Sequence, residues 1–126
     1  MQEYKVTVDS QGTVRWRDFK TDLPHRVDGP AVEYDNGDKY WFVKGKLHRE
    51  DGPAVEHPDG YKEWYIDGKY HRIDGPAIEY ADGDKSWYLD GVKYTENQFN
   101  AKMNSSSCEG REIKIDGQTY LIELKE

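Results

Sequence analysis

The sequence predicts a mainly β protein, an antiparallel meander of β-hairpins with one short helix and a C-terminal hairpin. The first observation is a segment of the form His-Arg-x-Asp-Gly-Pro-Ala-aliphatic-Glu, which occurs three times at a period of 23 residues, from His25, His48 and His71. The second is a tryptophan that recurs with the same period, at Trp41, Trp64 and Trp87. The third is the composition, with 35% hydrophobic residues and a mean hydropathy of -1.08, which suits a thin sheet better than a globule. Such a period is typical of small stacked units that are stable only against their neighbours.

Residues 1–22 are expected to form a degenerate hairpin that caps the N-terminal edge of the array. Gly12 and Trp16 keep the Gly-to-Trp spacing of the repeats. Val6 and Val8 precede the turn residues around Gly12, and Val14 follows them. A long sheet needs such a cap, because unpaired strand edges attract other chains.

Residues 23–94 hold about three repeats, and each repeat is expected to be one hairpin. In the first repeat, the Asp-Asn-Gly turn at 35–37 marks the hairpin, because Asn and Gly accept the positive φ of tight turns. The returning strand at 39–44 alternates with period two, which places Trp41 in the core and Phe42 on the opposite, wetter face. Residues 45–52 are expected to form a connecting loop, in which the final glycine supplies backbone freedom before a proline.

Residues 95–126 are expected to form a C-terminal cap. The segment from Thr95 to Gln98 has the form of a capping box, which predicts a short helix from about Glu96 to Met103. After a Ser-rich linker, strands at 112–115 and 119–124 flank an Asp-Gly turn and predict a last hairpin. We expect the whole chain to form one structural domain. The last hairpin either closes the core or pairs with a second copy of the chain in a homodimer.

Composition and charge limit the partners and the location. The net charge of -7 and the pI near 5.1 argue against a nucleic-acid partner, which usually requires a basic face. The single cysteine, Cys108, excludes an internal disulfide and favours a reducing compartment. The sequence has neither a signal-peptide pattern nor a long apolar run. We therefore expect a cytoplasmic protein that does not enter the membrane.

The repeated His, Arg and Asp side chains raise the question of a metal or catalytic site. Repetition argues against it, because a catalytic site is a single asymmetric constellation, whereas a residue present in every unit more often serves a need of every unit. We expect the Asp to accept backbone N–H bonds in its turn and the Arg to pair with the Glu that ends the segment. No His has a second ligand at metal-binding spacing. The sequence therefore predicts no enzyme activity, no cofactor and no bound metal.

The candidate binding residues are aromatic side chains on the face opposite the tryptophans, together with two repeat arginines. Tyr and Arg predominate in interface hot spots, and rings also stack on bases and sugars. The alternative is that this face is covered by its own long side chains or by the C-terminal helix. The predicted site consists of a first row of rings, a second row and the arginines: Phe42, Tyr65 and Tyr88; Tyr34, His57 and Tyr80; Arg49 and Arg72.

The run from Leu23 to Lys93 resembles the MORN-like repeat family, in the variant with His-Arg-x-Asp-Gly-Pro-Ala that occurs in bacterial and phage proteins. The resemblance covers a little over half of the chain. It implies a β-hairpin meander and a non-catalytic scaffold or binding role. A small acidic protein with a capped array also resembles phage accessory proteins, of which several families bind a host defence component.

Two functions are therefore expected from the sequence. The first is a non-enzymatic binding protein whose repeat surface holds a protein partner, as a phage-encoded inhibitor of a host defence effector in the host cytoplasm. The alternative is a sequestering protein for a small nucleotide-type immune signal, held by Arg and Tyr side chains where the array meets a cap or a second subunit.

Overall fold

The structure is a computed structural model that describes residues 3–108, 112–115 and 118–121. The chain divides into two compact units, Met1–Lys93 and Tyr94–Glu126. The sequence predicted that the repeats end at residue 94, and the first unit ends one residue earlier, at Lys93. The mainly β, antiparallel hairpin architecture expected from the sequence is confirmed.

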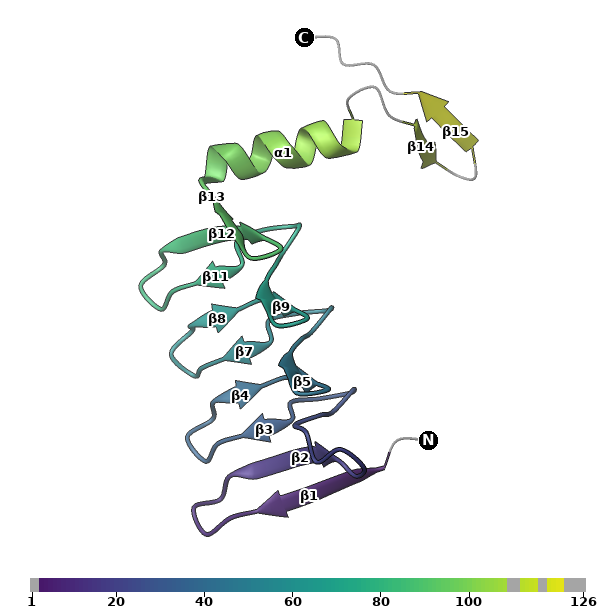
Figure 1. Cartoon of the computed structure of the whole chain (residues 1–126). Coiled ribbons are helices and arrows are strands. Elements are labelled where there is room, and N and C mark those ends of the chain that lie inside the picture. The colour runs from purple at the N-terminus through teal and green to yellow at the C-terminus, as the bar shows by residue number, and fades with distance from the viewer. Residues whose placement is uncertain (1–2, 109–111, 116–117, 122–126) are drawn as a thin grey trace. The chain divides into compact units, whose positions relative to one another are not determined.

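The first unit is built on one nine-stranded sheet in the order β1-β2-β3-β4-β7-β8-β11-β12-β13 (Figure 1). Each hairpin lies beside the next one in the sequence, so the sheet is a meander. The capping hairpin is present at its edge. The strands are β1 (Tyr4–Val8), β2 (Val14–Asp18), β3 (Val32–Glu33), β4 (Lys39–Tyr40), β7 (Val55–Glu56), β8 (Lys62–Glu63), β11 (Ile78–Glu79), β12 (Lys85–Leu89) and β13 (Val92–Tyr94).

The connection between hairpins is itself a small hairpin, where the sequence predicted a plain loop. β5 (Phe42–Val43) pairs with β6 (Lys46–Leu47), and β9 (Tyr65–Ile66) pairs with β10 (Lys69–Tyr70). Both are closed by two residues of positive φ; in the first, these are Lys44 at 51° and Gly45 at 82°. This is the geometry of a tight two-residue turn, and Lys is not a residue type that signals it.

The predicted continuous strand at 39–44 is interrupted at Trp41. The Trp41 N–H donates to the Ala54 carbonyl of the next large hairpin at 2.7 Å, while the Trp41 carbonyl accepts from the His48 N–H at 3.1 Å. The backbone thus passes from the large sheet into the small hairpin at this residue. In the third repeat the equivalent strand, β12, stays continuous.

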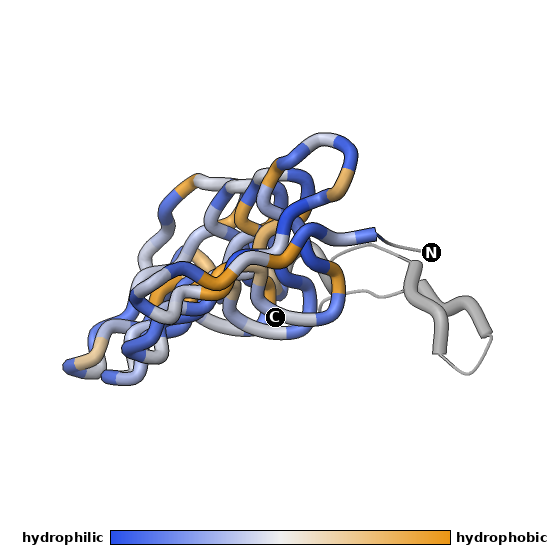
Figure 2. The backbone as a smooth tube through the Cα atoms, turned by 90° about the horizontal axis from the view of Figure 1, so that it is seen from below, coloured by the Kyte–Doolittle hydropathy of each residue, from blue (hydrophilic) through white to orange (hydrophobic). Residues whose placement is uncertain are grey.

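The core is formed by the Ala-aliphatic pair of each repeat rather than by the tryptophans. The alanines are completely buried and the aliphatic residues are at most 9% exposed: Ala31, Ala54 and Ala77; Val32, Val55 and Ile78. The sequence predicted that the tryptophans belong to the core, but the indoles are only half-buried. Viewed along the stack, hydrophobic residues gather near the middle of the first unit and the hairpin tips are mainly hydrophilic (Figure 2). A core of short side chains agrees with the low hydrophobic content.

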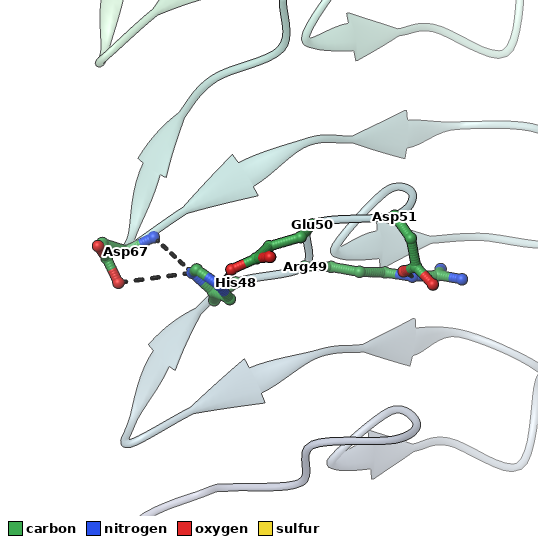
Figure 3. A network of polar contacts seen from close by, with 5 residues as sticks. All are labelled: His48, Arg49, Glu50, Asp51 and Asp67. Carbon is green, nitrogen blue, oxygen red and sulfur yellow. Dashed lines mark hydrogen bonds and ion pairs between the residues drawn. The ribbon is translucent and has the colours of Figure 1, made fainter. Parts of the chain in front are cut away.

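An arginine covers each of three indoles. The guanidinium carbons of Arg26, Arg49 and Arg72 lie 3.8, 3.9 and 3.8 Å from the ring centroids of Trp16, Trp41 and Trp64. These are cation–π contacts between one hairpin and the loop that follows it. In the middle copy, Arg49 Nε donates to Asp51 at 3.0 Å; both side chains are drawn in Figure 3. The Nη1 of Arg49 donates to the Pro53 carbonyl at 3.0 Å. The repeated aspartates therefore accept from arginine side chains, where the sequence suggested backbone N–H donors.

The glycine of each Asp-Gly-Pro is required by this arginine. A Cβ on Gly52 would lie 2.9 Å from the Arg49 guanidinium carbon, and the corresponding distances at Gly29 and Gly75 are 2.8 and 2.9 Å. None of these three glycines has a positive φ. The expectation that the glycine supplies backbone freedom is wrong, because its role is to leave room for the guanidinium.

The repeated histidine ties its loop to the next small hairpin. His48 Nδ1 accepts the Asp67 N–H at 3.0 Å, across a separation of 19 residues (Figure 3). The same bond joins His25 to the Lys44 N–H at 2.9 Å and His71 to the Asp90 N–H at 3.0 Å. Nδ1 accepts only when the ring proton is on Nε2. Each bond thus links a histidine loop to the next two-residue turn of positive φ in the sequence.

The second unit begins with the predicted capping box. The Thr95 N–H donates to Gln98 Oε1 at 2.9 Å and the Gln98 N–H donates to Thr95 Oγ1 at 3.1 Å. The helix α1 (Glu96–Cys108) extends five residues beyond the predicted end, through the Ser-rich segment. The sequence has no glycine or proline between Glu96 and Gly110 that would end the helix earlier. No helix in the described part of the chain is long and apolar enough to cross a bilayer.

The last hairpin is confirmed by β14 (Glu112–Ile115), which pairs with β15 (Gln118–Leu121). Glu112 lies opposite Leu121 and Ile115 lies opposite Gln118. The predicted Asp-Gly turn at 116–117 and the predicted end of the last strand at 122–124 lie outside the described residues.

The role of Gly52 predicts a specific energetic coupling. Gly52→Ala should displace the Arg49 guanidinium and lower the free energy of unfolding by about 1 to 3 kcal/mol, as overpacking does. In an Arg49→Ala background the added methyl group has nothing to displace. Urea denaturation of the two single variants and the double variant should therefore give a coupling energy of about 1 kcal/mol or more. Strictly additive effects would contradict this role for the glycine.

Candidate binding face

The strand register separates two faces of the large sheet. Residues that lie directly opposite each other on paired strands point to the same face. One row across the sheet therefore shares a face, and it contains Arg15, Val32, Tyr40, Val55, Glu63, Ile78 and Ser86. The neighbouring row, on the opposite face, alternates in charge: Glu33, Lys39, Glu56, Lys62, Glu79 and Lys85. Alternating charges favour this pairing, so the second row has a structural role.

A ladder of five rings crosses the hairpins. It contains the predicted second row together with two tyrosines that the sequence analysis did not single out. Successive ring centroids are 5.7, 6.1, 5.2 and 5.8 Å apart, in the order Tyr34, Tyr40, His57, Tyr61 and Tyr80. The two end rings keep the largest exposure, 40% for Tyr34 and 38% for Tyr80. Rings at these separations make favourable edge and tilted contacts.

A second cluster of rings contains two of the three residues in the predicted first row. Tyr65 stacks on Tyr70 with centroids 4.6 Å apart, and Tyr70 contacts Tyr88 at 4.7 Å. Phe42 belongs to neither cluster and lines a hollow with Tyr34 and Tyr40 instead. Tyr70 comes from the small hairpin β9–β10, which the sequence analysis did not predict.

Glu63 joins the two clusters. Its carboxylate accepts hydrogen bonds from the Tyr61 hydroxyl of the ladder and from the Tyr70 hydroxyl of the stacked cluster, the latter at 3.2 Å. The ladder, the stacked cluster and Glu63 therefore form one continuous surface, which we name the aromatic face. Eight rings and one carboxylate make up this face: Tyr34, Tyr40, His57, Tyr61, Tyr65, Tyr70, Tyr80, Tyr88 and Glu63.

Four phenols of the aromatic face have raised pKa values. Burial is the main cause that raises the pKa of Tyr61 and Tyr65, and hydrogen bonding and the charge of Glu63 raise it further. Burial also raises the pKa of Tyr40 and Tyr70. These hydroxyl groups therefore remain hydrogen-bond donors well above neutral pH.

The predicted arginines lie elsewhere. Arg49 and Arg72 cover indoles and pair with acidic groups, among them Glu79 at 3.2 Å from Arg72. Their side chains are 22% and 20% exposed. They line hollows formed by the His-Arg-x-Asp-Gly loops, which share no residue with the hollow that Phe42 lines. The structure thus brings five of the six predicted rings together in the aromatic face and leaves Phe42 and these arginines outside it.

The hollow beside Phe42 lies where the capping hairpin meets the first repeat. It has a volume of about 380 Å³. Phe42 of the first predicted row and Tyr34 of the second lie there together with two arginines of the capping hairpin. The complete lining is Arg15, Trp16, Arg17, Pro24, Val32, Tyr34, Tyr40 and Phe42. In the described part of the chain, no group of three or more His, Cys, Asp or Glu is arranged to hold a metal ion.

The residues that the sequence analysis missed occupy positions at which the repeats differ. Arg15, Tyr40, Glu63 and Ser86 all stand immediately before a tryptophan, and Leu47 stands where the next repeat has Tyr70. Invariant positions of a repeat maintain every unit, so a site that is made only once must come from the variable positions. An alignment of the repeats with one another, compared position by position, would have identified Glu63.

Comparison with known proteins finds no matching family model, no similar curated protein and no similar solved structure.

The raised tyrosine pKa values predict a loss of stability in alkaline solution. A tyrosine whose pKa is higher in the folded state than in the unfolded state binds more protons when folded. The free energy of unfolding should therefore fall as the pH rises above about 10. Urea denaturation between about pH 9 and 11 should show a shallower fall for Tyr65→Phe than for the wild type. The same slope in both proteins would show that Tyr65 does not contribute.

Proposed function

We propose that this chain is a non-enzymatic binding protein that holds a protein partner on its aromatic face. The single observation that supports this most is the continuity of that face, in which Glu63 connects the ring ladder to the stacked cluster. Tyrosine supplies rigid contact area and a hydrogen-bonding tip, and it is enriched in interface hot spots.

The size of the face favours a protein over a small ligand. The ladder runs from Tyr34, directly after β3, to Tyr80, directly after β11, and these strands lie four strand spacings apart in the sheet. At about 4.8 Å per spacing, this is about 19 Å. A specific protein interface covers about 800 Å² on each partner, and a surface of this length is suited to it. A drug-sized molecule would cover only part of the ladder.

The repeated polar residues support a non-enzymatic role. His48 is bonded to the Asp67 N–H, and Arg49 is bonded to Asp51 and to the Pro53 carbonyl. These side chains hold the hairpins together and have the same surroundings in each copy. Some of the side chains that vary between the copies, among them Tyr40, Tyr61 and Tyr70, lie in the aromatic face.

We take the class of partner from the resemblance to MORN-like repeat proteins and to phage accessory proteins. On that basis the partner is a host defence effector, which the protein binds and inhibits in the host cytoplasm. The alternative, sequestration of a small nucleotide-type signal, is favoured by one observation, the hollow with arginine and aromatic lining at the N-terminal end of the face.

The protein-binding function predicts a partner that depends on the exposed rings. The immobilised protein should enrich one protein from a bacterial lysate in stoichiometric amount. Tyr80→Ser should reduce the affinity by roughly tenfold or more, because a hot-spot ring contributes more than about 1.4 kcal/mol. Ile73→Ser is the matched control, since Ile73 is 64% exposed and lies in a loop outside the aromatic face.

Two outcomes would contradict the proposal. One is a partner lost with Ile73→Ser and kept with Tyr80→Ser, which would place the interface on the loops. The other is native mass spectrometry that shows a stoichiometric small-molecule adduct with no enriched protein, which would favour the nucleotide alternative.

A further inference from the structure

We propose that the hollow beside Phe42 is a binding site for a small ligand in which a flat ring carries a phosphate or carboxylate group. The site shares Tyr34 and Tyr40 with the aromatic face but includes neither Glu63 nor the stacked cluster, and its ligand is tested separately from a protein partner. The positive charge, the rings and the size of the hollow each support it.

The charge comes from the capping hairpin. Arg15 and Arg17 flank Trp16, at the positions where the first repeat has Tyr40 and Phe42 around its own tryptophan. The degenerate unit therefore has cations where the first repeat has rings, and both cations line the hollow. This is a local reversal of sign in a chain with a net charge of -7.

The two arginines differ in their partners. Arg15 Nη1 lies 2.9 Å from Asp9 Oδ2, and that ion pair raises the pKa of Arg15. Lys5, which lies opposite Arg17 in the register, is paired with Asp22 at 3.0 Å. No ion pair joins Arg17 to an acidic group within the described ranges. Arg17 is thus the cation of the hollow whose charge is available to a ligand.

The remaining lining suits a flat ring. Tyr34 and Tyr40 meet edge to face, with centroids 5.7 Å apart and an angle of 83° between the rings. Phe42 and Pro24 add apolar walls, and Val32 is only 9% exposed. Aromatic side chains of this kind stack on nucleobases and on other planar groups without strict sequence preference.

Size and geometry define the ligand class. A volume of about 380 Å³ is at the lower end of the range for small-molecule sites, about 300 to 1,000 Å³. It accommodates one ring system with its substituents and excludes a folded domain. The guanidinium group matches phosphate and carboxylate by two parallel, charge-assisted hydrogen bonds, which are stronger than those to an uncharged ligand.

Two kinds of ligand combine a flat ring with an anionic group. One is a free nucleotide, and the other is a peptide segment in which an aromatic side chain lies next to a carboxylate side chain. Isothermal titration of the whole chain should compare adenosine monophosphate, adenosine, inorganic phosphate and a Phe-Asp dipeptide at low salt. We expect saturable binding of the monophosphate or of the dipeptide, with adenosine and phosphate each weaker by roughly tenfold or more. The stronger of the two binders identifies the kind of ligand.

Variants assign the binding to this hollow. Arg17→Gln should weaken binding by roughly tenfold, and Arg17→Lys should weaken it less, because the charge remains and the paired hydrogen bonds are lost. Phe42→Leu should weaken the binding of the ring-bearing anions and leave the binding of inorganic phosphate unchanged. Lys20→Gln, an equal change of charge outside the hollow, is the control. Thermal denaturation of each variant establishes that it is folded.

Two results would overturn the inference. The first is the absence of saturable binding for both ring-bearing anions. The second is binding that Arg17→Gln leaves unchanged in a folded protein, or that Lys20→Gln weakens equally. Tyr80→Ser, which tests the protein-binding face, does not alter the lining of the hollow, so the two proposals are distinguishable.

Discussion

The stack of hairpins depends on the contact between an arginine and the tryptophan of the hairpin before it. Arg49 covers the Trp41 ring at 3.9 Å and is held there by Asp51 and by the Pro53 carbonyl, while Gly52 leaves the space that the guanidinium fills. This one contact explains why Arg, Asp, Gly and Pro recur together. Because alanine and valine provide only a thin core, such polar and cation–π contacts between units carry much of the stability.

Because each arginine must contact a tryptophan, the recurring and the variable positions of the repeat have different roles. The residues that recur hold each hairpin to the next, and therefore must be the same in every repeat. The positions beside the tryptophans are free to vary, and they supply Tyr40, Glu63 and Arg17. Functional asymmetry thus arises on a regular scaffold: a cationic hollow at the N-terminal end, an acidic group in the middle and rings throughout.

The sequence was sufficient for the features that depend on local patterns. Turn residues predicted the large hairpins, and the Thr95–Gln98 pair predicted the start of the helix. It was not sufficient where distant residues decide. The positive φ at Lys44 belongs to a small hairpin that His25 of the preceding loop stabilises, and the interruption at Trp41 follows from bonds to Ala54 and His48. A period-two pattern assumes a continuous strand, so it predicted a tryptophan core.

Nuclear magnetic resonance of the arginine side chains tests the central claim most directly. If the arginine–tryptophan contact holds the stack, the Nε–H resonances of Arg26, Arg49 and Arg72 are shifted by indole ring currents. Each then shows a nuclear Overhauser effect to the tryptophan eight or ten residues before it, Trp16, Trp41 and Trp64 respectively. Nε–H signals at the positions of free arginine, without contacts to indole protons in a folded protein, would contradict the account.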